Sequence, residues 1–189
     1  MRTPYESLEL AADHFPGKSG PNALFIHALM GQRQLLNDFT ADWRWQYGAT
    51  LNVDLPGHGA TPMPREDISI EATAAAVISA AQKHNLCDSV LIGQSMGALV
   101  AIQVAALAPE LASAVVLLDP APIVLDSSTR EGWAGLYNMM VGTEYQQALD
   151  ILIDAQSGPH DEPRRVSERE AIFRSTNASA ITSSFASML

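Results

Sequence analysis

The chain has one cysteine, Cys87, among its 189 residues, so it cannot form an intrachain disulfide. A single thiol fits a reducing compartment, and its place just before an apolar run predicts a small buried side chain rather than a reactive one. Long apolar stretches are also lacking, and none approaches the ~18 residues of a membrane-spanning helix. The first residues have no signal-peptide core. We therefore expect a cytoplasmic protein without membrane contact.

Basic clusters are scarce as well. Eleven Lys and Arg stand against 21 Asp and Glu, for a formal net charge of −10, and Arg164-Arg165 is an isolated pair. Binding to a phosphate backbone needs clustered positive charge, so we expect no nucleic-acid partner. The sequence Gly17-Lys18-Ser19 is not a phosphate loop, because position 12 is Ala rather than the required first Gly. We expect neither a metal nor a cofactor.

What the chain does have is a set of short apolar runs typical of buried strands. Helical patterns separate these runs from one another, which predicts right-handed βαβ units and a mostly parallel sheet with helices on both faces. An edge strand is expected within residues 5–15, and the aromatic stripe of the first helix is expected to be core. The predicted strands are 23–27, 50–55, 90–92 and 114–119, and the helices between them are 32–46, 68–84 and 98–107.

Polar residues end these predicted strands. In a parallel sheet the carboxyl ends lie along one edge, where ligands bind. The residues concerned are His27, Asp54, Ser95 and Asp119, which we expect on a common rim.

The strand ending at Ile92 runs into Gly93-Gln94-Ser95-Met96-Gly97, and a small, apolar helical segment follows. This strand–turn–helix context is that of a nucleophile elbow, in which strained backbone presents a Ser hydroxyl. Gly93 and Gly97 carry no Cβ, so strand and helix can approach closely. The Met96 N–H at the helix start would face negative charge developing on a substrate oxygen.

Together with three further segments, this elbow resembles the α/β-hydrolase superfamily, in its small cytoplasmic esterase, lactonase and carbon–carbon hydrolase branch. The segments that carry the resemblance are Leu24-Phe25-Ile26-His27-Ala28-Leu29, Asp54-Leu55-Pro56-Gly57-His58-Gly59 and Val116-Leu117-Leu118-Asp119-Pro120. The resemblance implies an α/β-hydrolase core over residues 1–120. It also implies a helical cap over 121–189, where the expected helices are 129–142, 144–156, 163–174 and 177–189.

The resemblance further implies that Ser95 is the nucleophile and that the backbone N–H groups of Met96 and Leu29 form the oxyanion hole. Ala28 stands where the family usually has Gly, which is tolerated unless the φ angle there is positive. His27 and His58 become structural or rim residues, with His58 shaping its turn.

The general base is the missing part of this constellation. In the family, a His late in the chain acts as the general base. Here only His160 follows Ser95, and because it lies in a loop of the expected cap, we do not expect it to be the base. Asp119 is a candidate acid, and it is also simply a residue that ends a strand before Pro120. Without a base a Ser hydroxyl is a weak nucleophile, so we expect very slow ester turnover from these residues alone.

The favoured interpretation is a serine hydrolase for a small carboxylic ester, lactone or related acyl compound, with the base and the acid outside this chain. A non-catalytic protein that binds a ligand or partner remains open, as does a cofactor-free lyase or haloperoxidase-like enzyme on the same scaffold. A sheet that stops after Asp119 exposes an edge, so we also expect self-association or pairing with a missing C-terminal portion.

Overall fold

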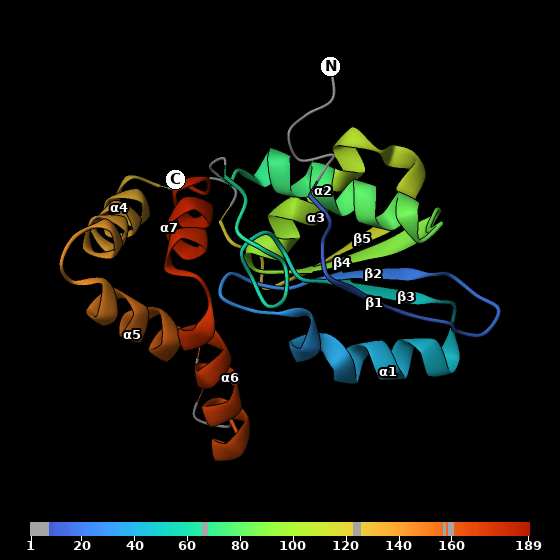
Figure 1. The fold of residues 1–189 in the computed structure, drawn as a ribbon, viewed down its shortest axis with the longest axis horizontal. Coiled ribbons are helices and arrows are strands. Elements are labelled where there is room, and N and C mark those ends of the chain that lie inside the picture. Colours follow the sequence, from blue (N-terminus) through green and yellow to red (C-terminus); the bar gives the residue numbers. More distant parts are fainter. Residues whose placement is uncertain (1–7, 66–67, 123–125, 157, 159–160) are drawn as a thin grey trace.

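The structure, a computed structural model, describes residues 8–65, 68–122, 126–156, 158 and 161–189. Its five-stranded sheet has the order β1-β3-β2-β4-β5 (Figure 1). Three strand pairs are parallel, and β1 runs antiparallel to β3 at one edge. The predicted mostly parallel sheet is therefore confirmed. The strands are β1 (Ala12–Phe15), β2 (Ala23–Ile26), β3 (Thr50–Val53), β4 (Ser89–Gln94) and β5 (Ala112–Leu118).

Helix α1 (Asn37–Gln46) covers one face of the sheet, while α2 (Ile70–Lys83) and α3 (Met96–Leu107) cover the other (Figure 1). The side chains of β2 and β3 are buried along their whole length, as expected for strands covered on both faces. Ser69 caps α2 by accepting a hydrogen bond from Ala72 N at 3.1 Å. Small residues along α2 and α3 let these two helices pack closely together.

Two burial predictions are wrong. On the stripe of α1, Phe39 and Tyr47 are exposed, and only Trp43 packs inward, edge-on to Phe25 with ring centroids 6.4 Å apart. A helix alone on its face of the sheet buries only a narrow stripe, so the remaining aromatic side chains stay outside. Cys87 is exposed, because it lies in the connection before β4 rather than in the buried strand.

Strand β5 forms as predicted, but it is not buried. Val115, Val116 and Leu117 each keep 37–39% of their surface exposed. The strand lies at the sheet edge and pairs with β4 alone. Because successive side chains point to opposite faces, exposure of three consecutive residues means that both faces are open there.

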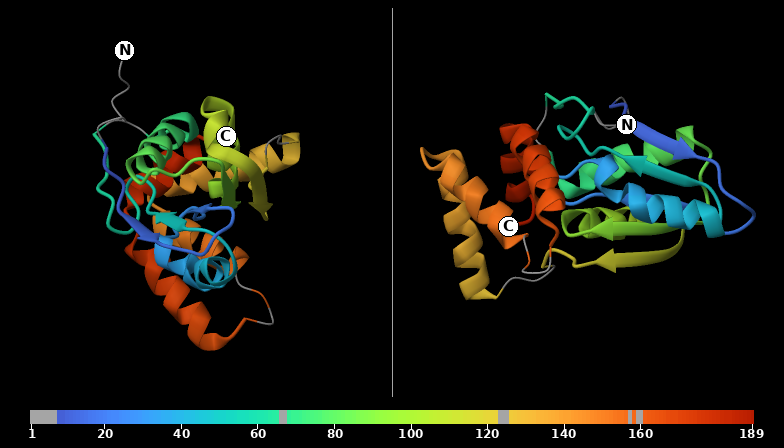
Figure 2. Two further views of the ribbon diagram at one scale, coloured as in Figure 1. Left: turned by 90° about the vertical axis from the view of Figure 1, so that its right-hand side faces the viewer. Right: turned by 90° about the horizontal axis from the view of Figure 1, so that it is seen from below.

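Four helices follow β5: α4 (Ser127–Val141), α5 (Tyr145–Ala155), α6 (Pro163–Ser175) and α7 (Ala178–Ala186). They lie together beyond one end of the strands, apart from the helices that flank the sheet (Figure 2). Asp126 caps α4 and Asn177 caps α7, each accepting two backbone N–H groups. None of the helices in the described ranges is long and apolar enough to cross a bilayer.

The loop after β3 is fixed by a buried carboxylate. Asp54 accepts hydrogen bonds from Arg33 N at 2.7 Å and Ala60 N at 2.8 Å, and it pairs with the Arg33 guanidinium. Gly59 has a φ of 51°, and a Cβ there would lie 2.2 Å from Asp54 Oδ2. This position therefore requires glycine.

We expect Gly59→Ala to lower the free energy of unfolding by about 2 kcal/mol or more, through left-handed backbone strain and collision with Asp54. The matched control is Gly132→Ala in α4, where an added Cβ meets nothing within 4 Å and helix propensity favours Ala. Urea unfolding of both variants is the measurement. Equal stabilities would contradict the proposed role of Gly59.

Candidate active site

Ser95 occupies the tip of the turn between β4 and α3. Its backbone has φ 51° and ψ −115°, a sparsely populated conformation for a residue with a side chain. The turn is anchored to the neighbouring strand, since Ser95 N donates to Leu118 O at 3.0 Å. This is the geometry that the sequence predicts for an elbow.

The flanking glycines make this turn possible. A Cβ on Gly93 would lie 2.2 Å from Gly97 O, and a Cβ on Gly97 would lie 2.3 Å from Ile26 O. Both contacts are with backbone that cannot move aside. Strand, turn and helix therefore cross at a separation that excludes any side chain at these two positions.

The turn Ala28–Gly31, after β2, faces Ser95 across the sheet edge. Ala28 O accepts hydrogen bonds from Gly31 N at 3.0 Å and from His27 Nδ1 at 2.7 Å. The same peptide unit carries the Leu29 N–H, so these two bonds fix the plane in which that N–H lies. Positive φ falls on Met30 (64°) rather than on Ala28, so an Ala in place of the usual Gly is tolerated. No acceptor among the described residues takes the N–H of Leu29 or Met96.

His27 and His58 are buried and brace two loops against each other. His27 Nε2 accepts from Leu55 N at 3.0 Å, and His58 Nε2 accepts from Met30 N at 3.3 Å. Each ring donates through Nδ1 to a nearby carbonyl, Ala28 O or Pro56 O. This pattern requires neutral imidazoles, and both ring nitrogens of each are used within the fold.

The electrostatics agree with that pattern. Burial, assisted by repulsion from His58, lowers the pKa of His27 to about 3. Burial likewise lowers the pKa of His58, opposed by its hydrogen bond to Pro56 O. These histidines are structural, which is one of the two roles that the resemblance implies for them.

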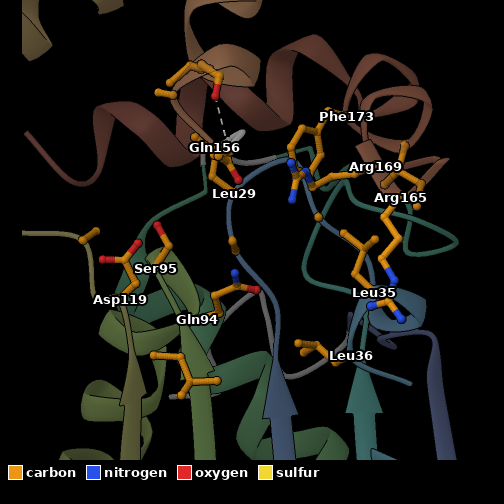
Figure 3. Close-up of a pocket in the computed structure, with 18 of the residues that line it drawn as sticks. Leu29, Leu35, Leu36, Gln94, Ser95, Asp119, Gln156, Arg165, Arg169 and Phe173 are labelled. Atoms are coloured by element: carbon orange, nitrogen blue, oxygen red, sulfur yellow. Dashed lines mark hydrogen bonds between the residues drawn. The ribbon is translucent and has the colours of Figure 1, made fainter. Parts of the chain in front are cut away.

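The expected rim is confirmed, because each of the four polar residues directly follows one of the parallel strands β2, β3, β4 and β5. Ser95 and Asp119 line one cavity and lie side by side, with the Asp119 carboxylate beside the Ser95 hydroxyl (Figure 3). Asp119 also has a positive φ, 45°. His27 and Asp54 lie on this rim, but they do not line the cavity. Their hydrogen bonds to neighbouring loops turn both side chains into the protein.

The cavity, about 1340 Å³, lies between the sheet edge and the four later helices. Its wall is mixed, slightly more apolar than polar, and the polar residues near α5 and α6 include Gln156, Arg165 and Arg169 (Figure 3). The arginines are paired, Arg165 with Asp38 at 3.3 Å and Arg169 with Asp161 at 2.8 Å. The large apolar lining residues are Leu29, Leu35, Leu36, Phe39, Leu118, Trp133, Leu136, Ile151, Leu152, Ile172, Phe173, Phe185 and Met188.

Apart from Leu29, which was expected in the oxyanion hole, none of these apolar residues was predicted from the sequence to belong to a site. Phe39 belonged to a stripe expected to be core, and Trp133 to a helix stripe without an assigned partner. The sequence signal that could have identified the cavity residues was the apolar stripe on the expected cap, residues 121–189. His160 lies outside the described residues, and no histidine of the described part lines the cavity. That part also holds no group of three or more His, Cys, Asp or Glu side chains arranged as a metal site.

The comparisons with known proteins agree with this fold. A family model described as "Alpha/beta hydrolase family" matches residues 20–185, so the chain belongs to the α/β-hydrolase family. A solved hydrolase from Pseudomonas aeruginosa superposes with a TM-score of 0.81 at 18% identity, and the match covers 95% of this chain and 68% of that one.

Two curated relatives are named as esterases. A pimeloyl-(acyl-carrier protein) methyl ester esterase of Methylococcus capsulatus is 31% identical over 117 residues, which are 62% of this chain and 42% of that protein. An esterase of Mycobacterium tuberculosis is 29% identical over 168 residues, 85% of this chain and 54% of that protein. The chain thus spans about half the length of these curated relatives.

The buried neutral histidines predict a pH dependence of folding. Their unfolded pKa is near 6.5 and their folded pKa is lower, so the unfolded chain binds more protons and stability falls as the pH drops below 6.5. Below pH 6.5, His27 contributes up to roughly a tenfold loss in the folding equilibrium constant per pH unit, and His58 adds a loss in the same direction.

Urea unfolding between pH 7.5 and 5 measures this slope, and His58→Gln should make it shallower. A free energy of unfolding that stays constant over this range would contradict the assignment.

Proposed function

We propose that this chain carries the nucleophile, the oxyanion hole and part of the substrate cavity of a serine esterase. Its substrate would be a small carboxylic ester, lactone or related acyl compound. The observation that carries the proposal is the strained Ser95, which lines a partly apolar cavity and lies beside two backbone N–H groups without described acceptors. Family membership and the esterase names of the relatives support the same reaction class.

In this reaction the Ser95 hydroxyl oxygen attacks the carbonyl carbon of the ester, and the carbonyl oxygen becomes an oxyanion. The N–H groups of Met96 and Leu29 are proposed to hold that oxygen. Met96 is the first residue of α3, so the positive end of the helix dipole adds to its N–H. A preorganised donor of this kind contributes roughly 10²–10³ in rate.

Helices α4–α7 are proposed to act as a cap. They supply most of the apolar cavity wall, including Trp133, Phe173 and Phe185, which suits an acyl chain or an apolar alcohol group. Closing over the strand ends, the cap would also keep water from the reacting carbonyl.

The proton of Ser95 needs an acceptor. His27 and His58 are ruled out because their ring nitrogens are used inside the fold. Asp119 is the one ionisable side chain that Figure 3 places beside Ser95, and we propose that it orients an imidazole or receives the proton directly. The imidazole base itself would come from outside the described residues.

We expect a fluorophosphonate ester to label the purified chain once, at Ser95, because this serine lies beside the proposed oxyanion hole, and we expect labelling to be slow without a general base. Ser95→Ala should abolish labelling. Ser113→Ala, which removes a hydroxyl on exposed β5, should leave it unchanged. Intact-mass spectrometry with peptide mapping measures this, and labelling that persists in Ser95→Ala would overturn the proposal.

We expect the chain alone to hydrolyse p-nitrophenyl butyrate slowly, and added imidazole to raise the Ser95-dependent rate at least tenfold by serving as the base. Ser95→Ala with the same imidazole gives the background. Rates that rise equally in both proteins would contradict a nucleophilic Ser95.

A ligand-binding protein without catalysis remains the second candidate. The cavity and the absence of a described histidine in its wall favour it. Tight binding of an acyl ligand, with no labelling of Ser95 and no Ser95-dependent hydrolysis, would indicate this second function.

A further inference from the structure

Thr176 connects the helical segment to the turn that carries Leu29. It is the single residue between α6 and the capping residue of α7, and its hydroxyl donates to Met30 O at 2.8 Å across 146 positions of sequence. The same hydroxyl lies 3.2 Å from Ile172 O within α6, so the shorter contact is the one that leaves the helix.

The backbone around Thr176 is fixed on both sides. Thr176 N donates to Phe173 O at 3.2 Å at the end of α6, and Asn177 accepts two N–H groups at the start of α7. Three residues further along, Ala180 packs on Gly57, where an added Cβ would come within 2.4 Å of the Ala180 Cβ. The α6–α7 junction therefore touches both the Met30 turn and the loop that carries His58.

Met30 needs such restraint. It is fully buried and has a φ of 64°, in the left-handed region that disfavours a residue with a Cβ. Its N–H is held by His58 Nε2 at 3.3 Å, and its C=O is held by Thr176. Strained conformations persist only where the surroundings over-determine them, and here one restraint comes from the core and the other from the helical segment.

The position of Met30 determines where the Leu29 N–H points. Leu29 lies between Ala28, whose carbonyl accepts two hydrogen bonds, and Met30, whose N–H and C=O are both bonded. If the Met30 carbonyl is released, the left-handed residue can relax and rotate the neighbouring peptide. The Leu29 donor then leaves the direction that the hydrogen bonds of Ala28 and Met30 impose.

We propose that Thr176 is a positioning residue, whose hydroxyl couples the seating of α6 and α7 over the cavity to the orientation of the oxyanion donor Leu29. This inference rests on the proposed function, because the direction of the Leu29 N–H matters for catalysis only if it holds an oxyanion. It makes the helical segment a part of the catalytic geometry as well as a wall of the cavity.

The test compares Thr176→Val, which keeps the shape and removes the hydroxyl, with Thr176→Ser, which restores it. Thr182→Val is the matched control, because the Thr182 hydroxyl bonds only within α7, to Ala178 O and Ser179 O. The first readout is hydrogen exchange of the amides in residues 28–31. Loss of one neutral hydrogen bond predicts roughly two- to tenfold faster exchange in Thr176→Val alone.

The second readout is the reaction of Ser95 with a short-chain fluorophosphonate, separated into its binding constant and its maximal rate of inactivation. Thr176→Val should lower the maximal rate about tenfold and leave binding within twofold, because the donor matters mainly once charge develops on oxygen. Thr176→Ser should react like wild type. A merely structural role would instead lower the melting temperature without this division between rate and binding.

Unchanged exchange at residues 28–31 in Thr176→Val overturns the inference. So does faster exchange with an unchanged inactivation rate, because the hydroxyl would then hold the turn without orienting the donor. If wild-type Ser95 does not react at all, the proposed function fails, and the exchange comparison still decides whether Thr176 restrains the turn.

Discussion

The close crossing of β4, α3 and β2 is the constraint on which the rest of the structure depends. A Cβ on Gly97 would lie 2.3 Å from Ile26 O, so helix and strand are separated by backbone alone. That separation forces the connecting residue into φ 51°, and the residue forced there is Ser95. Its side chain points to the strand ends because the chain has no room to turn in any other way.

Polar groups near this crossing serve the fold rather than the chemistry. The two buried imidazoles hold the loops after β2 and β3 together, and Asp54 gathers Arg33 and Ala60 around its carboxylate. Leaving any of these groups unpaired in the interior would cost free energy comparable to a lost hydrogen bond or more. These hydrogen bonds hold the Ala28–Gly31 turn in place near Ser95.

The helical segment gives this rim its cavity and one of its restraints. Trp133, Phe173 and Phe185 lie far from Ser95 in sequence and reach the cavity only because α4–α7 fold over the strand ends. The Thr176 contact with Met30 ties that segment to the turn. The turn after β2 and helices α4–α7 are therefore connected by a hydrogen bond as well as by apolar packing.

The sequence by itself determined the strands, the helices, the class of sheet and the elbow at Ser95, because these follow from local periodicity and from glycines at fixed spacing. It left the burial of Phe39 and Cys87, the inward turn of His27 and Asp54, and the composition of the cavity to the tertiary structure. Those properties depend on which distant segment packs over each residue. Hydrophobic periodicity and sequence motifs do not reveal contacts between distant residues, such as that between Thr176 and Met30, which lie 146 residues apart.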